Sequence, residues 1–133
     1  MGCDIHLHIE VKMDGKWHHY NHPDVGGNYA LFGLMAGVRG GSSLFPVRGL
    51  PENATEIVKF DAKCSETDGH THSYLDSKEI IKLIIAMRKL FIEWRAYKCF
   101  GYLFDNDFQD FYNYPGDYPP EIQDFRFIFW FDN

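Results

Sequence analysis

Residues 3–11 alternate without a break between apolar and ionisable side chains, and this pattern limits the folds open to the chain more than any other feature. A period of two residues predicts a β-strand with one face on a hydrophobic core. The other face carries only ionisable groups, in the order Asp4, His6, His8 and Glu10. Side chains two residues apart on one face lie about 7 Å apart, so neighbours in this row can share a substrate or a metal ion. These groups are typical of acid–base catalysis and cation binding, but a histidine-rich solvent face without a function would show the same alternation.

A tight turn is predicted at Asp14-Gly15, and a returning strand follows over residues 16–20. A two-residue turn would place His19 opposite Glu10 and add an imidazole to the ionisable face. A shift of one residue in the pairing would place His18 there instead. The sequence leaves both registers open.

The rest of the chain predicts three helices and one further strand. Helices are expected over Tyr29–Val38, within residues 52–63, and from a capping box at Asp76 and Glu79 to about Gly101. Residues 124–133 predict a strand that is apolar on both faces, as a central strand would be.

These elements predict an α+β fold in which residues 1–133 form a single domain. We expect an antiparallel sheet with an N-terminal hairpin and a C-terminal central strand. The long helix and the Tyr29 helix are expected to pack on one face of that sheet. The aromatic and acidic segment 102–120 is expected to form a covering flap, and the alternative is a set of aromatic surfaces on which a base stacks.

The composition of the chain limits which partners the protein can bind and in which cellular compartment we expect it. The chain has 13 basic and 19 acidic residues and a formal charge of -6, which argues against binding to long nucleic acid. A small nucleotide in a local basic pocket remains compatible with this charge. The start of the chain does not resemble a signal peptide, and no window is apolar enough for a membrane span. Three scattered cysteines are expected to be reduced thiols, so we expect a cytoplasmic protein without a membrane partner.

A second ionisable cluster, Asp68, His70 and His72, lies in the polar segment before the long helix, which we expect to be a loop. Together with Asp4 and His6 it supports two kinds of chemistry. One is a divalent metal centre, Zn or Mn, with Asp4, His6, His70 and His72 as ligands. The other is metal-free acid–base catalysis by the same four residues, in which His6 and His72 move the protons. The sequence does not decide between them.

Two arginines in glycine-containing turns, Arg39 and Arg48, are candidates to neutralise a phosphate group. Ser73 and His8 complete the expected substrate-binding set. Arg39 has a simpler alternative, because a basic side chain after a helix complements the helix dipole.

Two short motifs resemble those of calcineurin-type metallophosphoesterases: Asp4-Ile5-His6 and Gly69-His70-Thr71-His72. The intermediate motifs of that family, G-D-x-x-D and G-N-H-D/E, are absent from the chain. The resemblance therefore concerns the chemistry of the side chains and implies neither that fold nor its two-metal site.

A resemblance over nearly the full length is carried by five motifs, which are Met1–His6, Asn28–Phe32, Arg48–Pro51, His72–Leu75 and Phe129–Asn133. These motifs are similar to a family of small bacteriophage and prophage proteins. The resemblance implies a host bacterial cytosol and a role against host defences, and it carries over no catalytic residues.

Together these observations lead us to expect a phage-type hydrolase, a phosphodiesterase that cleaves a small nucleotide such as a cyclic nucleotide immune signal. One alternative is a non-catalytic protein that binds and sequesters such a nucleotide. Another is a protein inhibitor of a host defence factor, which would use the acidic, aromatic segment 105–118. Self-association into a homo-oligomer stays open.

Overall fold

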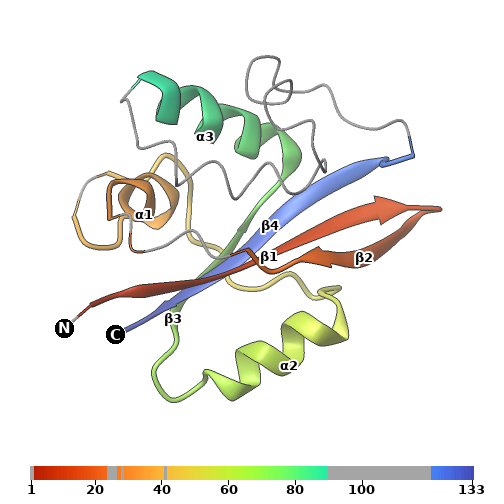
Figure 1. Ribbon diagram of the computed structural model, residues 1–133, viewed down its shortest axis with the longest axis horizontal. Helices are drawn as coiled ribbons and strands as arrows, with labels where there is room; N and C mark the ends of the chain where they lie inside the picture. Colours follow the sequence, from red (N-terminus) through yellow and green to blue (C-terminus); the bar gives the residue numbers. More distant parts are fainter. Residues whose placement is uncertain (1, 24–26, 28, 41, 90–120) are drawn as a thin grey trace.

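The computed structural model describes residues 2–23, 27, 29–40, 42–89 and 121–133. These residues form one four-stranded antiparallel sheet in the order β2-β1-β4-β3 (Figure 1). The strands are β1 (Asp4–Met13), β2 (Lys16–Asn21), β3 (His70–Leu75) and β4 (Asp124–Asp132). The helices are α1 (Tyr29–Ala36), α2 (Glu56–Cys64) and α3 (Ser77–Lys89).

The N-terminal hairpin closes through the predicted two-residue turn. Asp14 and Gly15 have positive φ angles of 53° and 75°, as a type I′ turn requires. This turn pairs Glu10 with His19, so the first of the two registers is the correct one. A bulge between Ile9 and Glu10 then gives β2 one extra residue.

The C-terminal strand β4 is central, as predicted, because it pairs with β1 on one side and β3 on the other. Every residue from Phe125 to Phe131 is buried. The odd-numbered phenylalanines pack into the larger core, whereas Ile128 and Trp130 pack into a smaller cluster on the opposite face.

The larger core lies between the sheet and the pair α1 and α3 (Figure 1). The α3 helix begins at the predicted capping box: the Glu79 N–H donates to Asp76 Oδ1 at 2.9 Å, and the Asp76 N–H donates to Glu79 Oε1 at 3.0 Å. Its buried side chains are Ile80, Leu83, Ile84 and Met87. The predicted end of this helix near Gly101 and the expected flap at 102–120 lie outside the described residues.

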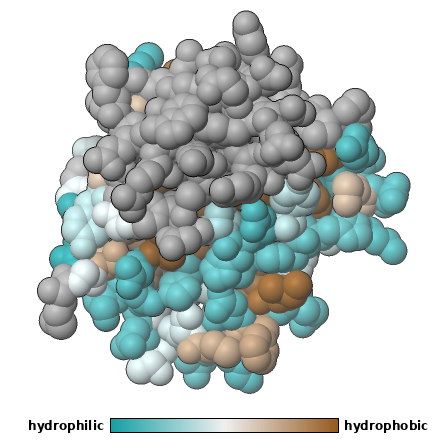
Figure 2. Space-filling view, viewed as in Figure 1, coloured by the Kyte–Doolittle hydropathy of each residue, from teal (hydrophilic) through white to brown (hydrophobic). Residues whose placement is uncertain are grey.

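The opposite face of the sheet is covered by α2 (Figure 1). Val58 of this helix packs with Ala54, Ile128 and Trp130. The outer side of α2 exposes Ile57 and Phe60, and Figure 2 shows hydrophobic surface among hydrophilic side chains in this part of the molecule. The predicted α+β class and the placement of α1 and α3 on one face are therefore confirmed, and α2 adds a cover on the other face.

Residues 70–75 form the edge strand β3, so the expectation that His70 and His72 lie in a loop was wrong. Their polar character reflects the edge position and an irregular register, not a lack of strand structure. His70 pairs with Phe131 and Ser73 with Phe129, so Thr71 and His72 together oppose the single residue Trp130. Thr71 adopts a positive φ of 58° within this bulge. Within the described residues, no helix is both long and apolar enough to cross a membrane.

Candidate functional site

The side of the sheet that α2 covers carries most of the ionisable side chains singled out in the sequence, and we call it the histidine face. At its centre is the fully buried indole of Trp130 on β4. His6 on β1 stacks on this indole with a centroid distance of 5.5 Å and an interplanar angle of 11°. His72 on β3 also stacks on it, at 5.5 Å and 19°. Because β4 lies between β1 and β3, the two predicted proton-transfer residues flank one indole on the same face.

His70 does not join them. It pairs with Phe131, whose side chain belongs to the core on the other face, and its Nδ1 lies 2.8 Å from Thr71 Oγ1. The bulge at Thr71 breaks the two-residue period, so the His70 ring lies near Phe131 whereas the His72 ring stacks on Trp130. The expectation that both imidazoles of the second cluster share one site with His6 is therefore corrected.

His6 is held by a carboxylate at the end of β4. Its Nε2 lies 2.6 Å from Asp132 Oδ2, and the two side chains are 26% and 29% exposed. Asp4, which was expected beside His6 in the site, is exposed and lies opposite Asp132 in the strand register. The carboxylate in contact with His6 is therefore Asp132, not Asp4.

His8 is the most enclosed imidazole of the face, with 1% of its surface exposed. Its Nε2 lies 2.6 Å from Asp61 Oδ2 and its Nδ1 lies 2.9 Å from His19 Nε2. Burial lowers the pKa of His8 to about 4, although the hydrogen bond to Asp61 opposes this shift. His8 is therefore neutral at neutral pH and has one N–H. A carboxylate only accepts, so this proton lies on Nε2 toward Asp61, and Nδ1 accepts from His19.

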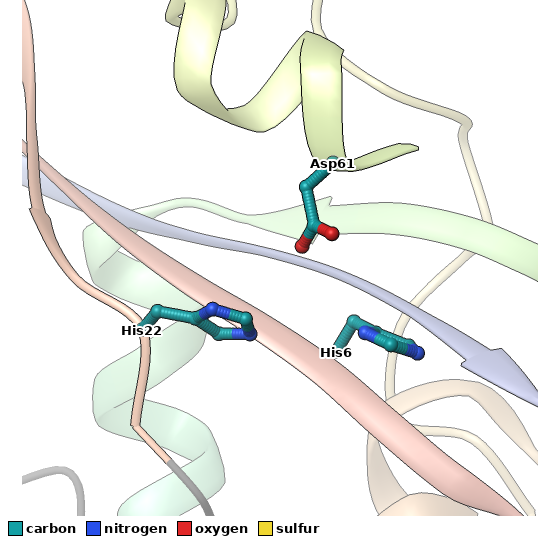
Figure 3. Close-up of side chains that lie close together, drawn as sticks. All are labelled: His6, His22 and Asp61. Atoms are coloured by element: carbon teal, nitrogen blue, oxygen red, sulfur yellow. The ribbon is translucent and has the colours of Figure 1, made fainter. Parts of the chain in front are cut away.

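Besides Asp132, two further residues that sequence reasoning missed complete the face. His22 directly follows β2 and stacks on His8 with a centroid distance of 4.1 Å. Asp61 lies on α2, and one ligating atom each from His6, His22 and Asp61 lie within 4.8 Å of one another. Figure 3 shows the Asp61 carboxylate pointing from α2 toward the two imidazoles.

Of these two residues, only Asp61 could have been predicted from a pattern in the sequence. Asp61 is three residues after the buried Val58, so it is a carboxylate at a position where an amphipathic helix faces the core. A charged group there is unusual unless it has a partner. His22 lies in an irregular segment where periodicity carries no information, and no local pattern indicated its role.

The fourth member of the N-terminal row, Glu10, has a structural role. It is fully buried and accepts hydrogen bonds from Arg126 Nε at 2.7 Å and from the Thr55 N–H at 2.8 Å. Arg126 also donates to the Asn53 side chain, and its guanidinium lies 4.0 Å from the Trp17 ring centroid. This network fixes the segment that leads into α2 and therefore the position of Asp61.

The expected phosphate-binding residues lie elsewhere. The Arg48 guanidinium forms two hydrogen bonds to the Glu79 carboxylate of α3, and its backbone N–H donates to the buried Ser73. This pairing raises the pKa of Arg48 and keeps its charge compensated. The Arg39 guanidinium lies 5.4 Å from the Tyr29 ring at the start of α1, on the other side of the sheet. Of the four predicted substrate contacts, only His8 contacts the other imidazoles of the histidine face. Arg48 lies beside β3, with its guanidinium 4.9 Å from the ring centroid of Tyr74.

No protein-family model matches the sequence, and no curated protein or solved structure is similar enough to show a family. The histidine face contains imidazoles, which are common proton-transfer groups and metal ligands, carboxylates that hold two of these imidazoles, and a set of ligand atoms suited to a divalent cation.

Proposed function

We propose that the protein hydrolyses a phosphodiester bond in a small nucleotide at the histidine face. One observation carries this proposal: four imidazoles and two carboxylates from β1, β3, β4, α2 and the segment after β2 lie together on the face that carries Trp130. These residues are His6, His8, His22, Asp61, Asp132 and His72. Such a collection is unusual for a purely structural surface, because buried ionisable groups destabilise a fold unless each has a partner.

His72 is suited to take the proton of an attacking water. Burial lowers the pKa of His72, and the neighbouring His70 lowers it further, so the ring is neutral and basic at neutral pH. The water oxygen would bond to phosphorus as the phosphorus–oxygen ester bond breaks.

His6, which lies on the other side of the Trp130 indole from His72, is suited to donate a proton to the leaving oxygen. Asp132 orients the ring through Nε2, as a carboxylate does in hydrolytic triads, and it stabilises the ring while it carries a proton. The departing alkoxide would take this proton and leave as an alcohol.

A cyclic signalling nucleotide is the substrate class implied by the resemblance to phage proteins. The formal charge of -6 favours a small ligand over long nucleic acid. The described arginines do not provide the positive charge, because Arg48 and Arg126 are paired with Glu79 and Glu10 and Arg39 lies beyond the sheet. A phosphate group at this face would need another source of positive charge.

Incubation with a panel of cyclic mono-, di- and trinucleotides, followed by mass spectrometry of the products, tests this proposal. We expect at least one cyclic nucleotide to gain one water and become linear. If a nucleotide binds but is recovered intact after heat denaturation, the protein sequesters it and the hydrolase proposal is wrong.

A further inference from the structure

Three ligating side chains meet on the histidine face although they are distant in sequence. His6 comes from β1, His22 from the segment after β2, and Asp61 from α2. Two imidazoles and one carboxylate are the protein ligands of several catalytic zinc sites, in which water or substrate occupies the remaining position. We propose that these three residues bind one divalent transition-metal ion, with zinc as the best match to the donor set.

The hydrogen bonds around the cluster leave one suitable atom free on each of two ligands. Asp132 engages His6 Nε2, so the lone pair of a neutral His6 is on Nδ1. His8 donates to Asp61 Oδ2, so Oδ1 remains available to a metal. Metal-binding histidines in proteins usually have their second nitrogen held by a carboxylate in this way, which fixes the tautomer and the ring orientation.

The spacing requires only a small adjustment. Zinc bonds of about 2.0–2.1 Å at tetrahedral angles place neighbouring ligand atoms about 3.3 Å apart. The three ligand atoms lie within 4.8 Å of one another, so they need to approach by at most about 1.5 Å. His22 is exposed and has the greatest freedom to do so, whereas His6 and Asp61 are fixed by Asp132 and His8.

His8 is the positioning residue of this site. Its ring donates to Asp61 and stacks on His22, so it contacts two of the three ligands without offering a free nitrogen itself. His19 accounts for its other nitrogen and fixes the tautomer that donates to Asp61.

The role of the metal in hydrolysis rests on the proposed function, whereas metal binding does not. A divalent cation at this position would supply the positive charge that the arginines do not bring to the face. It would also stabilise the charge that develops on a phosphate oxygen, and it would lower the pKa of a bound water. With His6 Nδ1 bound to the metal, the metal would stabilise the departing oxygen in place of the His6 proton, and that oxygen would take its proton from solvent. His72 would remain free to take the proton of the attacking water.

Isothermal titration of chelator-treated protein with zinc chloride, and absorbance after addition of cobalt(II), test the metal site. We expect one equivalent of zinc per chain and cobalt bands typical of tetrahedral coordination. His22→Ala should weaken zinc binding by about 100-fold or more, and His8→Gln by about 10–100-fold, the range for a residue that orients a ligand. His18→Ala is the matched control, because His18 is an exposed histidine of β2 outside the cluster.

Zinc binding that is absent, or that falls no further in His22→Ala than in His18→Ala, would overturn the site. Asp61→Asn provides a second ligand variant of nearly the same shape, and circular dichroism confirms that each variant is folded. Turnover measured in parallel separates the two proposals. Hydrolysis that persists in chelator without bound zinc removes the catalytic role of the metal and leaves the hydrolase proposal in place, whereas zinc binding without turnover of any nucleotide removes the hydrolase alone.

Discussion

His6 and Leu7 are adjacent on β1 and face opposite sides of the sheet. The His6 side chain is 26% exposed and contacts Asp132 and Trp130, whereas Leu7 is fully buried in the larger core. We expect His6→Ala to lower the free energy of unfolding by about 1 kcal/mol, the usual net value of one hydrogen bond. Leu7→Ala should lower it by about 2–5 kcal/mol, because it leaves a cavity.

Urea denaturation of both variants measures the two changes. An equal loss for His6→Ala and Leu7→Ala would make His6 a structural residue and would remove it from the site.

Protonation of His8 links stability to pH. Its pKa of about 4 in the fold is below its ordinary value of 6.5, so the unfolded chain binds more protons than the folded chain as pH falls below 6.5. The contribution of neutral His8 is therefore complete above pH 6.5 and is lost as pH falls toward 4. Burial lowers the pKa of His19 and His72 as well, and these shifts act in the same direction.

In metal-free protein we expect the free energy of unfolding to fall by about 2 kcal/mol between pH 7 and pH 5. Denaturation at a series of pH values measures this slope, with His8→Gln as the comparison. If the variant shows the same slope as the wild type, another group is responsible.

At the scale of elements, the Glu10–Arg126 pair connects the sheet to α2. Arg126→Met alone would leave the Glu10 carboxylate buried without its charged partner, and we expect a cost of about 3–5 kcal/mol. The double variant Glu10→Leu/Arg126→Met removes both charges and should be less destabilised than the single variant. Chemical denaturation of the wild type, of the single variants Glu10→Leu and Arg126→Met, and of the double variant measures the difference. If the double variant loses as much free energy of unfolding as the two single variants together, the Glu10–Arg126 interaction does not contribute to stability.

Local sequence patterns predicted an element correctly where a residue type strongly prefers one position in a turn or a helix cap. Asp14-Gly15 predicted the hairpin turn, and Asp76 and Glu79 predicted the start of α3, because turn and cap hydrogen bonds are local. The bulge at Thr71 was not predictable, because its positive φ arises from pairing with β4 and not from a glycine in the sequence. That single irregularity separates His70 from His72.

At the scale of the whole molecule, the site depends on where α2 packs. The alternation of β1 predicted that His6 and His8 share a face of the sheet. His72 was expected to lie near this face, and it stacks on the same Trp130 indole as His6. Asp61 and His22 reach this face only through long-range packing of α2 and the end of β2, which no local pattern encodes. The sequence therefore predicted that β1 contributes His6 and His8 to the site. It did not predict His22 and Asp61, which are two of the three residues in the proposed metal cluster.

Because the three metal ligands come from separate elements, a bound ion should stabilise the whole fold. A ligand present at 100 times its dissociation constant adds about 2.7 kcal/mol, which corresponds to an increase in Tm of about 5 °C or more for a small domain. Thermal denaturation with and without zinc measures this increase. It should be absent in Asp61→Asn, and an unchanged increase in that variant would place the ion elsewhere.

The turnover rates of His72→Ala and His70→Ala test most directly whether catalysis takes place at the histidine face. The two residues lie on the same strand, both are half-buried, and the bulge places only His72 against Trp130. Loss of a proton-transfer group reduces the rate by about 10²–10⁴-fold. We expect that loss in His72→Ala, with a rate close to that of the wild type in His70→Ala. Equal rates for the two variants, or a larger loss in His70→Ala, would contradict the assignment of catalysis to the histidine face.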